Sequence, residues 1–186
     1  MDSSDSRFTQ KSGFTLLELL VVIAIIAILA GLTVPVISRA VESGRRTTAM
    51  TEVASLEAAV RAYYNEYSRF PHQGANKAQY IGGNADLINV LRAIDGEGNA
   101  NHVNNRRRIV FLEVPDRSLS RNNAGDIETN PDMVDPWGVP YNVAVDVQFR
   151  NEVDTSQPHG ILENRMIAVW SGGADPSDVS RHLTSW

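Results

Sequence analysis

The sequence contains no cysteine among its 186 residues. Neither a disulfide bond nor a thiolate metal site can form, so packing and hydrogen bonds must stabilise the fold. Cytosolic and exported proteins can both lack cysteine, and its absence therefore does not identify the compartment.

Motifs of common enzymes are missing as well. The sequence has no Gly-x-Ser-x-Gly, no phosphate-binding glycine loop and no zinc signature. No two of its histidines have a spacing typical of metal ligands. They are His72, His102, His159 and His182. Nothing in the sequence therefore argues for an enzyme.

Positive charge is scarce. The chain has 17 Lys and Arg against 22 Asp and Glu, with a net charge of -5 and a pI near 5.3. This balance argues against a nucleic-acid-binding protein, and we expect no nucleic acid partner. The cluster at residues 106–108 is three arginines long, and in an acidic chain it is more typical of an exposed strand edge than of a phosphate site.

Apolar residues are concentrated near the start of the chain. From Leu19 to Leu32 every residue is apolar or glycine, and the apolar character resumes as far as Ile37. About 20 such residues suffice to cross a bilayer. Residues 14–37 are therefore predicted to form a hydrophobic helix, either transmembrane or in the core of a filament.

One acidic residue, Glu18, lies at the start of this apolar segment. A carboxylate there costs roughly 2.5 to 3.5 kcal/mol in a bilayer, so it is expected to have a partner. A secretory signal peptide cleaved near residues 38–40, or a plain membrane anchor, are the simpler interpretations. The apolar run exceeds the roughly 7 to 15 residues of a signal peptide, and neither interpretation explains Glu18.

The segment Gly13-Phe14-Thr15-Leu16-Leu17-Glu18, with the apolar run that continues to Ala30, resembles the class III signal of type IV pilins and type II secretion pseudopilins. The resemblance implies that a prepilin peptidase cleaves between Gly13 and Phe14, and that Phe14 is then N-methylated. Residues 1–13 would be the leader peptide. The mature chain would cross the bacterial inner membrane once, in contact with lipid before assembly, with its head in the periplasm and later in a periplasmic filament.

The resemblance also implies a role for Glu18 in assembly. In a filament of parallel helices, Glu18 of one subunit would pair with the Phe14 amine of a neighbour, which neutralises both charges and fixes the stagger between subunits. A pairing within one chain is the alternative, because residues four apart share a helix face. The partners would be identical and related pilin subunits and the inner-membrane assembly proteins of a secretion system.

Gly31 and Pro35 lie near the far end of the apolar segment. A proline removes one helical hydrogen bond and clashes with the carbonyl four residues before it, so a helix break or kink is predicted here. It is either a simple break at the membrane exit or a segment that loosens when the subunit leaves the bilayer.

Residues 38–69 are predicted to form an amphipathic helix. Its apolar residues recur at intervals of three and four, with Glu52 and Glu57 expected on the solvent-facing sides. Pro71 should end the helix. The apolar stripe consists of Ala49, Val53, Leu56, Val60, Tyr63 and Tyr67.

Residues 70–186 are predicted to form a globular head. A polar loop from residue 72 to 84 precedes a short amphipathic helix at 86–94. Strands are predicted at 109–114, 139–149 and 166–170, the second with Val143, Val145, Val147 and Phe149 on one face. The expected fold class is α+β and pilin-like: a long N-terminal helix packed on a small antiparallel sheet.

Two segments of the head resemble signatures of the major pseudopilin of type II secretion. They are Asp135-Pro136-Trp137-Gly138-Val139-Pro140-Tyr141 and Val169-Trp170-Ser171-Gly172-Gly173-Ala174-Asp175. Proline and glycine fix the backbone of such segments, and their aromatic residues are expected to pack in the small core.

Calcium is a possible ligand. Major pseudopilins bind it near the C-terminus, which makes Asp175 and Asp178 candidate ligands, although Pro176-Ser177 departs from the family pattern. Alternating polar residues from Asp95 resemble a calcium loop, but Arg106 replaces its final glutamate. A solvated turn is the better interpretation of that segment.

The sequence thus favours a structural subunit, a pseudopilin that polymerises into a type II secretion pseudopilus and helps to export folded proteins. A type IV pilin of a surface pilus, serving adhesion, motility or DNA uptake, is the nearest alternative. Many such pilins close a C-terminal loop with a disulfide, which this chain cannot form. A membrane-anchored exported domain is a further alternative.

Overall fold

The computed structural model describes residues 14–71, 78–156 and 158–186. The chain divides into two compact units, Met1–Glu42 and Ser43–Trp186. One helix, α1 (Leu16–Tyr67), contributes residues to both units. Each unit is described by itself.

In the first unit, α1 runs through Gly31 and Pro35 without ending. The predicted interruption of the helix at these residues is therefore wrong, because losing one backbone hydrogen bond does not end a helix whose adjacent turns keep theirs. A bend at this point stays a prediction. Among the described residues, no helix meets the length and hydropathy required to cross a membrane.

In the second unit, α1 buries the predicted apolar stripe. Ala49, Leu56 and Val60 are fully buried, and Tyr67 is half-buried. Glu52 is an exception to the prediction, because its side chain is buried instead of facing solvent. The helix ends at Tyr67, as predicted from the proline that follows.

The second unit holds a four-stranded antiparallel sheet in the order β1-β2-β5-β6 and a separate two-stranded hairpin of β3 and β4. β2 and β5 pair along four residues, with Val143 opposite Val169. The α+β class is confirmed. The strands are β1 (Gln79–Tyr80), β2 (Asn142–Val145), β3 (Glu152–Asp154), β4 (Ile161–Glu163), β5 (Ile167–Ser171) and β6 (Leu183–Thr184).

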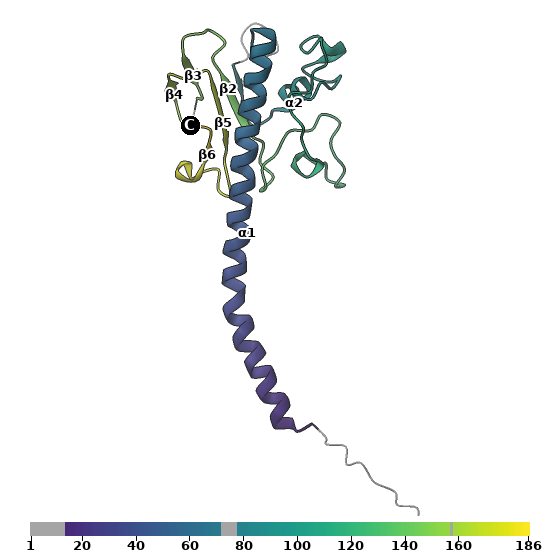
Figure 1. The fold of residues 1–186 in the computed structure, drawn as a ribbon, viewed down its shortest axis with the longest axis vertical. Helices are drawn as coiled ribbons and strands as arrows, with labels where there is room; N and C mark the ends of the chain where they lie inside the picture. The colour runs from purple at the N-terminus through teal and green to yellow at the C-terminus, as the bar shows by residue number, and fades with distance from the viewer. Residues whose placement is uncertain (1–13, 72–77, 157) are drawn as a thin grey trace, which may run out of the picture. The chain divides into compact units, whose positions relative to one another are not determined.

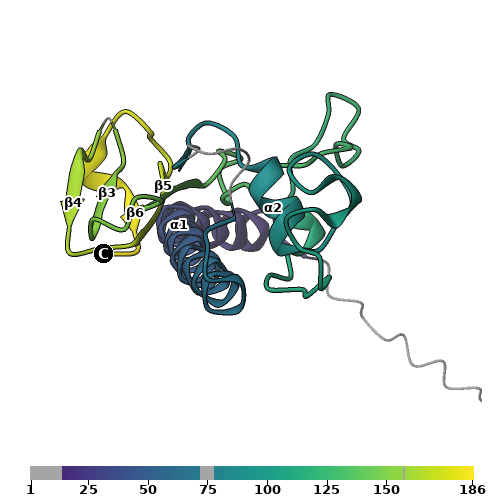
Figure 2. The same ribbon diagram turned by 90° about the horizontal axis from the view of Figure 1, so that it is seen from above.

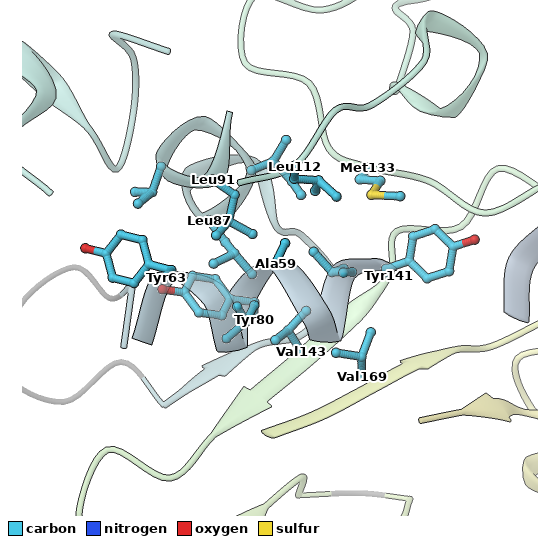
Figure 3. Close-up of a cluster of buried hydrophobic side chains, with 14 of the residues drawn as sticks. Ala59, Tyr63, Tyr80, Leu87, Leu91, Leu112, Met133, Tyr141, Val143 and Val169 are labelled. Carbon is cyan, nitrogen blue, oxygen red and sulfur yellow. The ribbon is translucent and has the colours of Figure 1, made fainter. Parts of the chain in front are cut away.

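The second half of α1 lies between this sheet and α2 (Ala85–Leu91) with its adjoining loops (Figures 1 and 2). Side chains from all three meet in one apolar core (Figure 3). Tyr63 of α1, Leu91 of α2 and Val169 of β5 are all fully buried there. The described residues of the unit also form three 3-10 turns, η1 (Ala100–His102), η2 (Asp116–Ser118) and η3 (Val179–Arg181).

The strand predicted at residues 109–114 does not form. Leu112 and Val114 of this segment are nevertheless buried, so its apolar residues contribute to the core. Its backbone joins no sheet, however: the amides of Phe111 and Leu112 both donate to the carbonyl of Leu91, at the end of α2. The segment thus closes the C-terminus of a helix, which a sequence pattern cannot distinguish from strand pairing.

The strand predicted at residues 139–149 is shorter than expected. β2 ends at Val145 because the buried carboxylate of Asp146 accepts hydrogen bonds from the amides of Gln148 and Asn151 and closes a turn. Phe149 was expected on the same face as Val143 and Val145, which are buried, but its side chain is 58% exposed and its φ is 55°. The loop at 72–84 was also incompletely predicted, since it contains β1.

Buried asparagine side chains connect segments that no sheet joins. The Nδ2 of Asn84 donates to the carbonyls of Met133 and Tyr141, at 3.0 and 2.8 Å. The Nδ2 of Asn105 donates to the carbonyl of Val90 at 2.8 Å. Each such amide satisfies backbone groups that burial would otherwise leave unpaired. The buried asparagines are Asn84, Asn89, Asn99 and Asn105.

Gly98 permits the close approach of its loop to α2. Its φ is +83°, and a Cβ at this position would lie 2.3 Å from the carbonyl oxygen of Asp86. We expect Gly98→Ala to lower the free energy of unfolding by about 3 kcal/mol, because backbone strain and a backbone clash add. Urea unfolding followed by tryptophan fluorescence measures the loss.

Gly125→Ala is the matched control. Gly125 also has a positive φ, +88°, but no atom lies within 4 Å of the position of its Cβ. The free energy of unfolding of Gly125→Ala should fall by only about 1 to 2 kcal/mol, the cost of the backbone strain without a clash. Equal losses in the two variants would contradict the clash at Gly98.

Candidate functional site

The start of α1 is organised by Thr15 and Glu18. The Oε2 of Glu18 accepts hydrogen bonds from the backbone amide and the hydroxyl of Thr15, both at 2.8 Å. The amide of Glu18 in turn donates to the Thr15 hydroxyl at 3.2 Å. This reciprocal arrangement is a capping box, in which two side chains satisfy amides that the first helical turn leaves unpaired.

Of the predicted site residues, the structure describes Phe14 and Glu18, while Gly13 lies outside the described residues. Sequence reasoning missed Thr15, although a threonine three residues before a glutamate is a recognisable capping signal. Both contacts to Glu18 fall on Oε2, and within the described ranges no hydrogen bond reaches Oε1.

The first unit presents large apolar side chains around this helix start. Those between Leu16 and Leu29 have exposed fractions from 44% to 88%. Such a surface is unfavourable in water and needs lipid or protein to cover it.

In the second unit, Asp135 and Ser171 join the two predicted head motifs. The Ser171 hydroxyl donates to Oδ2 of Asp135 at 2.6 Å, and both residues are buried. The Oδ1 of Asp135 accepts from the amides of Trp137 and Val139, both at 3.0 Å. The carboxylate therefore fixes the turn of its own motif and attaches it to the end of β5.

Glu52 links α1 to the same region. Its two carboxylate oxygens accept hydrogen bonds from the Tyr141 hydroxyl at 2.6 Å and from the Ser118 hydroxyl at 2.7 Å. Burial raises the pKa of Tyr141, and the hydrogen bond to Glu52 raises it further. The tyrosine therefore stays a hydrogen-bond donor throughout the physiological range. The predicted structural use of the aromatic residues fits this geometry, since Tyr141 and Trp170 are buried.

Asp175 and Asp178, the predicted calcium candidates, make hydrogen bonds within their own loop, and a calcium site here stays a prediction. The Oδ1 of Asp175 accepts from the Ser177 hydroxyl at 2.6 Å, and this hydrogen bond lowers the pKa of Asp175. Asp178 likewise accepts from the Ser180 hydroxyl at 2.6 Å and forms an ion pair with Arg181. Calcium requires six or more oxygens, yet the described part of the chain holds no group of three acidic or histidine side chains suited to a metal.

The calcium-like pattern that begins at Asp95 forms a turn, as the sequence indicated. The Oδ1 of Asp95 accepts a hydrogen bond from the amide of Asn101 at 2.8 Å. The amide side chain of Asn99 is directed to the backbone of its own loop, where its oxygen accepts from the amides of Asn104 and Asn105.

Comparisons with known proteins support the interpretation of the N-terminal region. Residues 9–34 match the family model of the prokaryotic N-terminal methylation motif. This match and the relatives below confirm the predicted resemblance to prepilin-type proteins of type II secretion.

The curated relatives include the type II secretion system core protein G of three bacteria. Identity is 40% over 62 residues for Pectobacterium carotovorum subsp. carotovorum, covering 33% of this chain and 40% of the relative. For Aeromonas hydrophila it is 40% over 62 residues, covering 33% and 43%. For Klebsiella pneumoniae it is 39% over 62 residues, covering 33% and 44%. The chain spans less than half the length of these relatives, and no solved structure matches it significantly.

Loss of the Thr15 hydroxyl should weaken the start of α1. In Thr15→Val the Glu18 amide loses its acceptor, and we expect about 1 kcal/mol of helix-end stability to be lost. Thr15→Ser retains the hydroxyl and serves as the control. Amide hydrogen exchange at residues 16–18, measured by NMR on the full chain in detergent micelles, should be faster in the valine variant only. Equal exchange in both variants would contradict the capping role.

Proposed function

We propose that this chain is a pseudopilin, a structural subunit that a prepilin peptidase processes and that polymerises into a type II secretion pseudopilus. One observation carries the proposal: a methylation motif at residues 9–34 coincides with a capped helix start and an exposed apolar helix surface. The resemblance to core protein G supports assignment to type II secretion.

Two features favour a filament subunit that begins at Phe14. Peptide-bond cleavage after Gly13 would leave an ammonium group at Phe14, immediately before the capping box. Glu18 uses Oε2 for its own helix start, and Oε1 can accept a hydrogen bond from the Phe14 ammonium of a neighbouring subunit. A charge-assisted bond of this kind, in an apolar filament core, compensates two groups that are costly to bury singly.

The same features favour anchoring in the inner membrane before assembly. Lipid would cover the apolar side chains of the first unit, and neighbouring helices would replace that lipid in the filament. We infer a single crossing with the head in the periplasm. The partners are then the peptidase, identical and related subunits, and the inner-membrane assembly proteins of the secretion system.

In this function the head is a structural element and not a catalyst. Its buried carboxylates, Glu52, Asp135 and Asp146, are each held by two or more hydrogen-bond donors from the head itself. Groups committed in this way fix the positions of motifs and leave little capacity for acid–base chemistry on a substrate.

Processing provides the first test of the proposal. After coexpression with a prepilin peptidase, mass spectrometry of the purified protein should find a mature chain that begins with N-methylated Phe14. Expression without the peptidase is the control and should give an unprocessed chain. A mature chain that starts at Met1 or Val41 in the presence of the peptidase would exclude the proposal.

Substitutions at Glu18 separate the charge from the cap. Glu18→Gln keeps an acceptor for the Thr15 amide but loses the charge, whereas Glu18→Ala loses both. We expect both variants to be cleaved after Gly13 and both to lose filaments at least tenfold, since the charge is required. Filaments are measured by shearing and sedimentation. Normal assembly of Glu18→Gln would rule out the charge pairing and leave only the helix cap.

A further inference from the structure

Two histidines far apart in the sequence meet in the second unit. His159 lies in the turn between β3 and β4, and His182 lies between η3 and β6. The Nε2 of His159 is 3.0 Å from the Nδ1 of His182. The Nε2 of His182 is in turn 3.0 Å from the carbonyl oxygen of Pro176. The three groups form a chain that connects the hairpin to the loop before β6.

The Pro176 carbonyl determines which nitrogen of His182 carries a hydrogen. A carbonyl oxygen only accepts, so the Nε2 of His182 must carry its hydrogen. In a neutral ring the Nδ1 of His182 is then an acceptor, and the Nε2 of His159 donates to it. The arrangement is therefore complete when both imidazoles are neutral.

Aromatic packing excludes water from one side of the pair. The ring of His159 lies edge-on to Trp170 and Trp186, with centroids 5.7 and 5.1 Å away. This burial lowers the pKa of His159, and the neighbouring His182 lowers it further. One added proton can be shared along the hydrogen bond. A second proton would place two N–H groups and two positive charges against each other.

Charged groups on the surrounding elements are engaged elsewhere. Asp154 of β3 accepts from the Ser156 amide, and Asp178 pairs with Arg181 of η3. Among the described residues, no carboxylate or guanidinium makes a hydrogen bond to either imidazole. The charged residues of these elements are Glu152, Asp154, Glu163, Arg165, Asp175, Asp178 and Arg181.

We propose that His159, His182 and the Pro176 carbonyl form a pH-sensitive latch that fastens the loop at residues 172–182, and with it β6, to the β3–β4 turn. The latch is closed when both rings are neutral and opens when both are protonated. It depends on no metal ion and does not rest on the function proposed above.

The direction of the pH dependence follows from linkage. A histidine whose pKa is lower in the folded state than in the unfolded chain binds fewer protons when folded. The stability it contributes is fully present above the unfolded pKa of about 6.5 and is lost as the pH falls through the lower folded-state pKa. Acid should therefore loosen this loop before it protonates the carboxylates, whose ordinary pKa values lie near 4.

Hydrogen exchange of the full chain in detergent micelles tests the latch. After correction for intrinsic exchange, protection of residues 172–182 should fall about tenfold between pH 7.5 and 5.0, because protonation of the pair removes the hydrogen bond that fastens the loop. His159→Gln keeps an N–H donor for His182 but cannot titrate at this pH. In this variant we expect less than a threefold fall. His102→Gln, which removes a ring from η1, should retain the full dependence.

A second measurement keeps the test independent of variant folding. NMR of the His159 imidazole in the wild-type chain should show a pKa below the ordinary histidine value, because burial and the neighbouring His182 disfavour the charged ring. Protection that does not change with pH, a midpoint below about 4.5, or an unchanged dependence in His159→Gln would each overturn the proposal. A midpoint in the ordinary range of carboxylates would assign the effect to acidic side chains instead of the histidines.

Discussion

The second unit depends on one constraint: its apolar core forms only if α1 is enclosed from two sides. The strands contain two to five residues each, and a sheet of that size buries little area by itself. The stripe on α1 supplies the surface that both the sheet and α2 cover. Tyr63, for example, is fully buried and donates through its hydroxyl to the carbonyl of Asn104.

Polar side chains stabilise the loops that this small core does not cover. Much of the second unit is loop, and its buried backbone groups have no sheet partners. Asparagine amides satisfy several of them, because one amide can donate and accept at the same time. Buried carboxylates do the same between motifs: Asp135 joins a turn to β5, and Glu52 joins α1 to Tyr141. Without disulfides, these bonds define the arrangement of the loops.

In the first unit the apolar side chains are exposed, whereas those of the second unit form a buried core. Its helix exposes an apolar surface, so it is suited to an environment that water does not provide. Glu18 is compatible with this surface because it also serves the helix start, where amides lack partners. A negative side chain is favourable at that end of a helix, both as a cap and in the field of the helix dipole.

The sequence by itself determined the prepilin-type segment, the long helix and the position where it ends, and the membership of the apolar stripe. These follow from local order and from periodicity, which act along the chain. It also determined the apolar, β-rich character of residues 109–114, but not that the segment contacts α2. Only the tertiary structure decided that question, because a backbone amide bonds to whichever carbonyl the fold brings near.

The same holds for Glu52, Phe149 and the histidine pair. Periodicity placed Glu52 on a polar face. Its carboxylate can nevertheless be buried, because the hydroxyls of Ser118 and Tyr141 donate hydrogen bonds to it. These two residues lie 66 and 89 positions later in the chain. Asp146 turns the chain so that Phe149 becomes exposed. His159 and His182 are 23 residues apart in the sequence, and no local spacing indicates their contact. Such contacts join distant segments, and only the completed fold specifies them.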